Sequence, residues 1–282
     1  MQVTSESEFE VGEFGFRALF TALAFGALAG CSTTDTATSQ DGVSPSGFAA
    51  GQVDRELRET ATQARSTSLS GRTLRVRSIG DIRLRSKEVI LTFDDGPVPG
   101  RTDRILNTLD RYGVKATFLM VGTMVQNSPS LARRVYRRGH AIGSHTWTHD
   151  NLARKSFGAS VADIKRGEDA LRRAGVRDIP FFRFPYLSDT RALRNHLAGR
   201  GVIVLDADID SKDYRRQSPA ALASSTMAKV RKRGRGIILM HDLQPRTVSA
   251  LPSLLAMLNR EGYKVVNLQP ARGNPAFPVA AR

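Results

Sequence analysis

Two histidines four residues apart and a pair of adjacent aspartates are the residues of this chain best suited to chemistry. His145 and His149 lie in Ser-His-Thr-Trp-Thr-His, and a spacing of four brings two imidazoles together on a helical turn, where they can bind one metal ion. Asp94 and Asp95 end the apolar run Val-Ile-Leu-Thr-Phe. Successive residues point in different directions, so one carboxylate can reach a metal while the other faces a water molecule. Together the four side chains indicate a hydrolytic metal site.

Each of these signals also has a plain structural explanation. Histidine pairs at this spacing occur on ordinary protein surfaces, and Asp-Asp-Gly-Pro at 94–97 is typical of a tight turn. A turn does not explain why two acids end an apolar run. His140 and His196 fit no metal-binding pattern and are interpreted as structural, and Asp206 and Asp208 are interpreted as loop caps.

Alternating apolar segments predict the elements that must position these residues. Between the segments typical of strands lie segments with helical spacing of apolar residues, several of which end at a glycine. This alternation predicts an α/β fold with parallel strands, in an open sheet or a closed barrel. The predicted strands are 89–93, 116–121, 141–144, 181–184, 202–205, 237–240 and 263–268.

Polar residues follow five of the predicted strands. In open α/β sheets and in β/α barrels alike, the carboxyl ends of parallel strands meet and form the active site. We therefore expect these residues to share one site. They are Asp94 and Asp95 after the first strand, His145 after the third, 183–186 at the end of the fourth, 206–213 after the fifth and His241 after the sixth.

These segments resemble the five motifs of the polysaccharide deacetylase family, the nodulation-protein-B homology domain of carbohydrate esterase family 4. The resemblance covers about residues 88–268, and the motifs occur in the order that the family has. The fourth motif usually ends in Asp-Trp, so Tyr214 is the one clear departure. The motifs are Thr-Phe-Asp-Asp-Gly-Pro at 92–97, Ser-His-Thr-Trp-Thr-His at 144–149, Arg-Phe-Pro-Tyr at 183–186, Asp-Ser-Lys-Asp-Tyr at 210–214 and Leu-Met-His at 239–241.

The resemblance implies the central roles in the reaction. Asp95, His145 and His149 would hold a divalent metal, which we expect to be zinc, with cobalt as the alternative. Asp94 would be the general base that takes a proton from water, and His241 the general acid that protonates the leaving amine.

Supporting roles follow from the same resemblance. Arg183 would pair with Asp94 and keep it ionised, and Asp213 would hydrogen-bond His241 and raise its pKa. The backbone N–H of Tyr186 would stabilise the oxyanion of the tetrahedral intermediate. The predicted substrate-binding residues are Trp147 and Leu239, which would form a slot for the acetyl methyl group, and Tyr214 on the sugar side.

The predicted fold is a distorted, incomplete (β/α) barrel of about seven parallel strands. The predicted function is metal-dependent removal of N-acetyl groups from an amino-sugar polymer or oligomer, either peptidoglycan or a chitin-like glycan. Two alternatives remain. The same fold and metal could act on a cyclic ureide or imide, or the chain could be a non-catalytic module that binds a glycan or a nucleic acid. A complete set of base, acid and metal ligands speaks against the second alternative.

The first thirty residues predict export. Residues 18–29 form a 12-residue apolar run that is too short for a transmembrane helix but typical of a signal-peptide core. The run ends in Leu-Ala-Gly-Cys, which resembles the lipobox of bacterial lipoproteins, with Cys31 as the lipid attachment site. The segment before the run is acidic, which points to a later translation start. Ser32 favours the outer membrane, so we expect a cell-envelope lipoprotein that faces the periplasm, and export speaks against the ureide alternative.

The remaining sequence predicts a tethered domain with a basic surface. The net charge is +15, and the basic runs at 133–138, 172–173 and 229–233 fall late in predicted helices, where cations complement the helix dipole. We therefore expect solvated helix ends, a glycan as partner and no specific nucleic acid. The predicted segments are a lipoprotein signal peptide (1–30), a flexible tether (31–52), a basic N-terminal extension (53–87) with a strand near 74–76, the catalytic domain (88–270) and a C-terminal tail (271–282).

Overall fold

The fold is built on a nine-stranded sheet, seen in a computed structural model that describes residues 68–271. Seven strands pair in parallel in the order β6-β5-β4-β3-β2-β8-β7, and within the described residues no pairing joins β6 to β7. The result is an incomplete barrel. Its strands are β2 (Glu88–Asp94), β3 (Thr117–Met120), β4 (Ala141–Ser144), β5 (Phe181–Phe182), β6 (Ile203–Val204), β7 (Ile209–Asp210) and β8 (Gly236–His241).

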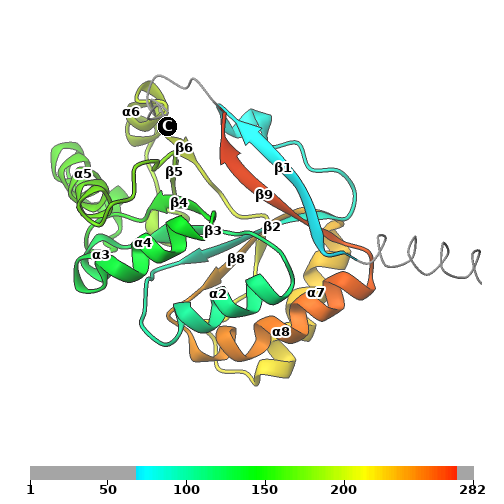
Figure 1. The fold of residues 1–282 in the computed structure, drawn as a ribbon. Helices are drawn as coiled ribbons and strands as arrows, with labels where there is room; N and C mark the ends of the chain where they lie inside the picture. The colour runs from blue at the N-terminus through cyan, green and yellow to red at the C-terminus, as the bar shows by residue number, and fades with distance from the viewer. Residues whose placement is uncertain (1–67, 272–282) are drawn as a thin grey trace, which may run out of the picture. The chain divides into compact units, whose positions relative to one another are not determined.

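Two further strands cover the end of the barrel where its strands begin. Strands β1 (Ser70–Val76) and β9 (Lys264–Pro270) pair in parallel and lie side by side (Figure 1), and β9 joins the barrel at the start of β2. The other end of β9 reaches the start of β4, where Gln269 donates a hydrogen bond to the carbonyl of Gly139. Apolar side chains of β1 and β9 pack with those of six barrel strands in one buried cluster. The barrel is therefore plugged at this end.

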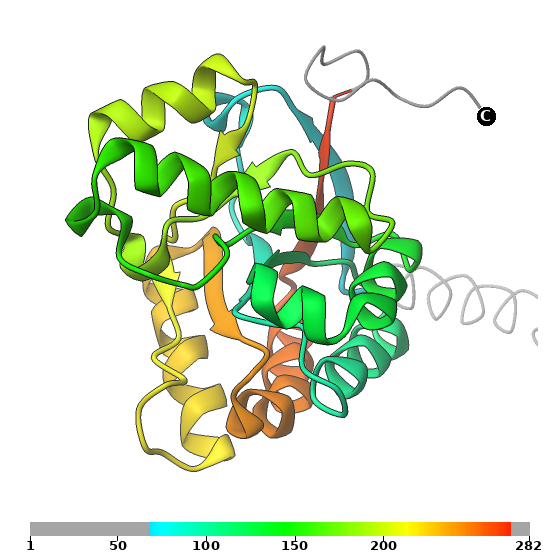
Figure 2. The ribbon, with the colours of Figure 1, turned by 90° about the vertical axis from the view of Figure 1, so that its left-hand side faces the viewer.

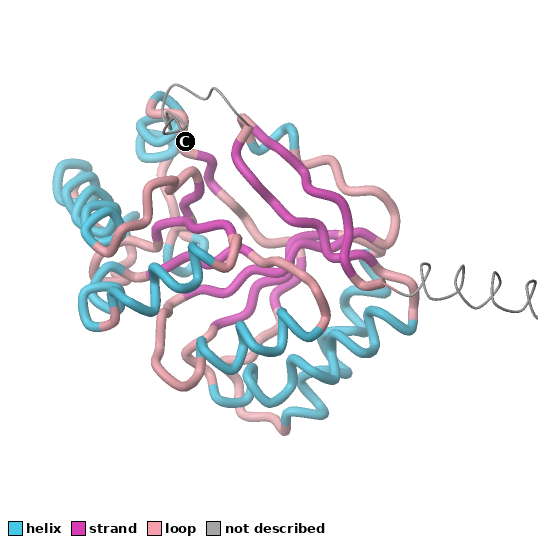
Figure 3. Tube along the Cα trace, in the orientation of Figure 1, coloured by secondary structure: helices cyan, strands magenta, loops and turns pink. Residues whose placement is uncertain are grey.

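Helices surround the barrel on the outside of its strands (Figure 3), and the long helix α5 crosses the front of the second view (Figure 2). The cap residues Ser156, Thr190 and Ser218 each accept a backbone N–H with their side chains, so these helix starts are fixed locally. No helix within residues 68–271 has the length and apolarity needed to cross a membrane. The helices are α2 (Thr102–Arg111), α3 (Gly122–Asn127), α4 (Pro129–Arg137), α5 (Phe157–Arg173), α6 (Arg191–Gly199), α7 (Pro219–Arg233) and α8 (Pro245–Arg260), with short 3-10 turns η1 (Ile79–Asp81), η2 (Leu152–Arg154) and η3 (Pro185–Leu187).

The direction of each helix decides which parts of the chain meet. Almost every helix starts near the end of one strand and returns to the start of a later one, so strand ends and helix starts lie at one end of the barrel. We call this end the mouth, and the end plugged by β1 and β9 the base. Ile105, Leu106 and Leu109 on the inner face of α2 are fully buried, and the same helical spacing holds the other helices against the barrel.

The α/β fold with parallel strands is confirmed, and three details differ from the prediction. The segment predicted as a strand at 263–268 pairs with β1 at the base, and its place among the seven barrel strands is taken by β7. Strand β7 has two residues and is too short to show a pattern. The strand predicted near 74–76 belongs to the same sheet, so the fold begins before residue 88. The predicted signal peptide, Cys31 and the tether lie outside the described residues.

Candidate active site

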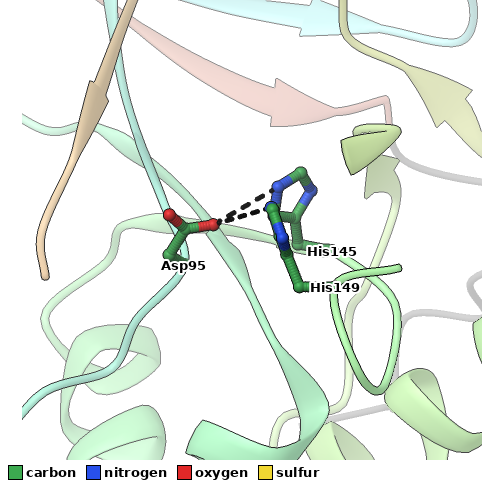
Figure 4. A group of neighbouring side chains, drawn as sticks. All are labelled: Asp95, His145 and His149. Atoms are coloured by element: carbon green, nitrogen blue, oxygen red, sulfur yellow. Dashed lines mark ion pairs between the residues drawn. The ribbon is translucent and has the colours of Figure 1, made fainter. Parts of the chain in front are cut away.

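Three ligand atoms converge at the mouth of the barrel (Figure 4). Oδ1 of Asp95 lies 3.5 Å from Nε2 of His145 and 3.2 Å from Nε2 of His149. Ligand atoms of the three residues all lie within 4.8 Å of one another. Oδ1 of Asp95 is buried and has no hydrogen-bond partner within the described residues. Such an unpartnered carboxylate oxygen beside two imidazole nitrogens fits a cation between them.

The protonation of His145 supports this interpretation. Its Nδ1 lies 2.7 Å from the carbonyl oxygen of Arg183, so Nδ1 carries the proton and Nε2 presents a lone pair. Burial lowers the pKa of His145 more than the carboxylates of Asp94 and Asp95 raise it. The imidazole is therefore neutral, as a metal ligand must be. The lone pair on Nε2 of His145 and the carboxylate of Asp95 repel each other at 3.5 Å, unless a cation lies between them.

The histidines lie together for a different reason from the one predicted. Residues 145–149 form a bent loop and not a helical turn. Thr146 and His149 have positive φ angles of 70° and 61°, and Oγ1 of Thr146 accepts the backbone N–H of His149. Asp163 on α5 accepts the backbone N–H groups of Trp147 and Thr148. The loop folds back on itself, and the two rings come within 4.9 Å, measured between centroids.

The second aspartate is held by a buried arginine. Oδ1 of Asp94 accepts a 2.8 Å hydrogen bond from Nη1 of Arg183, whose exposed fraction is 1%. The same guanidinium donates to Oγ1 of Thr92 and to the carbonyl oxygens of Leu205 and Asp206. These contacts satisfy the buried charge and fix the carboxylate of Asp94. Its Oδ2 is left 3.9 Å from Nε2 of His145, beside the three metal donors.

His241, at the end of β8 and in register with Asp94 on β2, is paired with a fully buried aspartate. Its Nδ1 lies 2.6 Å from Oδ1 of Asp213, and Oδ2 of Asp213 accepts the backbone N–H of His241 and the hydroxyl of Thr247. Burial disfavours the charged imidazolium, but the hydrogen bond and charge of Asp213, with the charges of Asp94 and Asp95, outweigh it and raise the pKa of His241 to about 9. His241 is therefore protonated at neutral pH, as a proton donor must be.

These groups share one cavity of about 550 Å³. Tyr186 has a φ angle of 59° on the turn η3, and its backbone N–H donates no hydrogen bond to any described residue. Six of the seven described non-glycine residues with positive φ lie in the loops that form this cavity, which is typical of functional sites. The cavity is lined by Asp94, Asp95, His145, His149, Arg183, Phe184, Tyr186, Leu187, Asp210, Tyr214, Leu239, His241 and Gln244.

The predicted substrate-binding residues take three different positions. Leu239 lines the cavity from the end of β8. Tyr214 is half exposed at the rim, where its hydroxyl donates to Asp210 and its ring meets His241 edge-on at 6.0 Å. Trp147 does not line the cavity. It lies in the main hydrophobic cluster, with the guanidinium of Arg166 stacked 4.0 Å above its ring, so the structure places it in the core, whereas the prediction placed it beside the acetyl group.

The sequence did not single out Asp242, which the structure places beside this cavity. Its carboxyl group is fully buried, Oδ2 accepts the hydroxyl of Thr102, and its backbone N–H donates to the carbonyl of Asp94. Burial raises the pKa of Asp242 to about 7. A side chain at Gly96 would meet this carboxyl group at 2.0 Å, so only glycine fits there. Asp242 follows His241 directly, and this adjacency was the one available signal.

Four polar residues set aside in the sequence have structural contacts. Nδ1 of His140 accepts the backbone N–H of Ala116, and burial lowers the pKa of His140 to about 3. Asp206 pairs with Arg194 and Asp208 with Arg233. His196 packs edge-on against the ring of Phe157. None of the four lines the cavity.

Comparison with known proteins agrees with this geometry. The sequence profile described as polysaccharide deacetylase matches residues 81–203. A chitooligosaccharide deacetylase from a Bradyrhizobium species is 32% identical over 204 residues, which cover 67% of this chain and 92% of that protein. The chain belongs to the polysaccharide deacetylase family. Members of this family depend on a metal, so Asp95, His145 and His149 form the candidate metal site of a polysaccharide deacetylase.

Two further relatives act on peptidoglycan, as their names state. The peptidoglycan N-acetylglucosamine deacetylase PgdA of Listeria monocytogenes is 29% identical over 188 residues, and the matched region spans 67% of this polysaccharide deacetylase but 39% of the Listeria protein. The structure of a peptidoglycan deacetylase from Bdellovibrio bacteriovorus matches with a TM-score of 0.64 and 33% identity, covering 77% of this chain and 61% of that one.

Proposed function

We propose that this polysaccharide deacetylase hydrolyses N-acetyl groups on an amino-sugar polymer, either peptidoglycan or a chitin-like glycan. The observation that carries the proposal is the shared cavity, in which a fixed carboxylate, a protonated histidine and three metal donors face the same space. A non-catalytic binding module has no use for this combination of acid and base. The names of the relatives support the substrate class.

Two side chains of the cavity, Asp94 and His241, carry out the proton transfers. A divalent metal at Asp95, His145 and His149 would polarise the acetamide carbonyl and lower the pKa of water. Asp94, oriented by its bond to Arg183, takes the proton from the water that attacks the carbonyl carbon.

Tyr186 and His241 complete the hydrolysis. The free N–H of Tyr186 donates to the oxyanion that forms when the water adds. His241 then donates its proton to the amide nitrogen as the C–N bond breaks, which releases acetate and the free amine. Asp213 stabilises His241 in its charged form and holds its ring in position.

The metal we propose is zinc, with cobalt as a functional substitute. Two imidazoles and one carboxylate, with positions left open for water and substrate, are the ligand set of catalytic zinc. Such a set disfavours the hard cations magnesium and calcium, which prefer oxygen ligands.

We also propose that the protein is a cell-envelope lipoprotein attached through Cys31 and exposed to the periplasm, in the outer membrane. The support is the short apolar run followed by Leu-Ala-Gly-Cys. Labelling cells with a fatty-acid analogue should label the wild-type protein but not a Cys31→Ala variant. An unlabelled wild-type protein in the cytoplasm would exclude this location and favour the cyclic ureide alternative.

Acetate release tests the proposed reaction directly. The zinc-loaded protein is incubated with peptidoglycan, chitin oligomers, acetylated xylan and a cyclic ureide, and Asp94→Asn serves as the matched inactive control. We expect acetate from one of the two amino-sugar substrates and none from the control. Turnover of the ureide alone, or equal acetate release by the Asp94→Asn protein, would overturn the proposal.

A further inference from the structure

The base of the barrel gathers the positive charge of the helices. The last turns of α2, α4, α5, α7 and α8 all contain arginine or lysine, whereas α2 alone has an acidic residue in its first turn. Because these helices end at the base, the cations that complement their dipoles accumulate there, opposite the catalytic cavity. One end of the molecule therefore carries much of its excess positive charge.

Within this end, three arginines define a surface that we call the arginine face: Arg133, Arg137 and Arg177. Two adjoining shallow hollows of about 430 and 440 Å³ lie beside α4, and Arg133 and Arg137 line both of them, while Arg177 lines the second. All three side chains are exposed, and none forms a hydrogen bond or an ion pair within residues 68–271. A guanidinium whose N–H donors are not already hydrogen-bonded is suited to binding phosphate.

Neighbouring acids do not neutralise the arginine face. Asp110 is bound to Arg138 and Lys115, and Asp178 accepts the hydroxyl of Tyr136. Neither carboxylate forms an ion pair with Arg133, Arg137 or Arg177 within the described residues. The three guanidinium charges are therefore available to an external anion.

The described chain also enters the fold at the base of the barrel. Ser70, at the start of β1, pairs with Val265 near the start of β9, and Lys264 pairs with Glu88 at the start of β2. The described chain therefore enters the domain at the base, and the segment that leads back to Cys31 joins it there. The catalytic cavity opens at the other end of the same strands.

We propose that the arginine face binds the phosphate groups of an anionic phospholipid surface and holds the catalytic cavity directed away from the membrane. Attraction to a charged bilayer is additive over scattered cations and needs no fixed geometry, which suits exposed, unpaired guanidinium groups. Nucleic acid is disfavoured because single strands are bound through exposed aromatic rings, and the one aromatic residue in the hollows, Tyr136, is half-buried with its hydroxyl bound to Asp178. The inference depends neither on catalysis nor on lipidation.

Vesicle sedimentation tests the arginine face apart from any lipid anchor. The full chain carrying Cys31→Ala is mixed with vesicles of phosphatidylcholine alone or with about one-third phosphatidylglycerol, at low and high salt. The test variant replaces Arg133, Arg137 and Arg177 by Gln in that background. The matched control replaces three exposed arginines near the mouth that also have no ion-pair partner, Arg104, Arg154 and Arg191.

We expect binding to the anionic vesicles that high salt reverses, and little binding to phosphatidylcholine. A basic residue at such a surface contributes about fivefold to the affinity, so the test variant should bind about 10- to 100-fold more weakly. The control should lose less than about threefold, since its charges lie at the far end. A variant with Lys at the same three positions keeps the positive charge and should retain most of the binding. It provides a second test if the Gln variant does not fold.

Three results would overturn the proposal. Equal losses in the test and control variants would show that net charge alone is responsible. Equal binding to neutral vesicles would show that an apolar segment makes the contact. Binding of duplex DNA with the same dependence on Arg133, Arg137 and Arg177 and with higher affinity than the anionic vesicles would assign the face to nucleic acid.

The orientation can be tested because Cys31 is the only cysteine of the chain. In the Cys31→Ala background, a fluorophore is attached either to Ala198→Cys in the last turn of α6, at the base, or to Ala153→Cys in η2, at the mouth. Both sites are exposed. Anionic vesicles with a headgroup quencher should quench the fluorophore at residue 198 and not at 153. Equal quenching, or the reverse order, would contradict the proposed orientation.

Discussion

The mouth and the base of the barrel use charge in opposite ways. In the catalytic cavity at the mouth the central charges are buried, and Arg183 and Asp213 have each of their polar groups assigned to a particular partner. At the base the charges are many and exposed, and the arginine face has no partner within the described residues. A buried charge interacts strongly with the few groups placed around it, whereas exposed charges attract a ligand through their summed electrostatic potential. The two ends should therefore respond differently to the same kind of mutation.

One topology produces both ends. Parallel strands place their carboxyl ends at the mouth, and the helices that return between them place their own carboxyl ends at the base. Residues that follow strands become the site, and residues that close helices become the basic surface. In a parallel α/β barrel, the position of a residue within each strand–helix unit therefore decides at which end of the barrel it lies.

The largest effect is expected from the metal site. Removal of the metal by a chelator should abolish deacetylation, and zinc or cobalt should restore it, because the metal held by Asp95, His145 and His149 would activate the attacking water. Asp94→Asn should keep about one metal per chain and lose about 10²- to 10⁴-fold in kcat, since it removes the base and leaves all three donors. Metal analysis and kcat on the same samples measure both. Full activity after exhaustive chelation would refute this role of the site.

The second-largest effect is expected from His241→Ala, which tests proton donation separately from metal binding. His241→Ala should retain the metal and lose about 10²- to 10³-fold in kcat on an N-acetyl sugar, because the leaving amine needs a proton. On an activated aryl acetate, whose leaving group needs none, the loss should be less than about tenfold. Steady-state rates on the two substrates give the comparison. Equal losses would mean that His241 does something other than protonate the amine.

A smaller effect is expected in the pH profile. Because Asp213 raises the pKa of His241 to about 9, the acid stays protonated and active below that pH and is lost as the pH rises through it. Asp213→Asn should move the alkaline limb of kcat down by about 1 to 3 pH units. The same raised pKa stabilises the fold fully below about pH 6.5, and this contribution disappears as the pH rises through about 9.

Two measurements check this behaviour. The kcat profile locates the alkaline limb, and thermal unfolding at pH 6 and pH 10 follows the stability. A bound divalent cation repels the imidazolium, so the limb of the zinc enzyme should lie at or below pH 9. An alkaline limb that stays in place in the Asp213→Asn protein would show that another group titrates there.

The smallest effect is expected at the base. Replacing Arg133, Arg137 and Arg177 by Gln should change kcat on a soluble oligomer by less than about twofold and the free energy of unfolding by less than about 0.5 kcal/mol, since the three side chains are exposed and unpaired. Kinetics and denaturant unfolding provide the values. A large loss of kcat would contradict the separation of the two ends.

Most of the site could be predicted from the sequence because its residues follow strands and lie in recognisable motifs. Asp94, Asp95, His145, Arg183 and His241 all line the cavity. Thr247 and Asp242 could not be found in this way. They act through contacts with Asp213 and with the loop around Gly96, which are distant along the chain and carry no pattern of their own.

The sequence correctly predicted that His145 and His149 lie together, but the structure gives a different reason for it. The spacing of His145 and His149 predicted a helical turn, but the pair is held by a bent loop that Asp163 anchors from α5. Trp147 lies within the same motif, and local pattern alone could not show that its ring turns into the core. Side-chain direction in an irregular loop depends on tertiary contacts.

The sequence by itself determined the fold class, six of the seven barrel strands and the identity of the groups that can transfer protons and bind a metal. These follow from apolar periodicity and from side-chain chemistry, which are local properties. Only the tertiary structure decided that 264–270 joins β1 at the base while the two-residue strand β7 completes the barrel edge. It alone also decided that Asp213 raises the pKa of His241 and that Arg133, Arg137 and Arg177 line two adjoining hollows. Strand partners, burial and summed charge depend on distances between residues far apart in sequence, and no local pattern contains those distances.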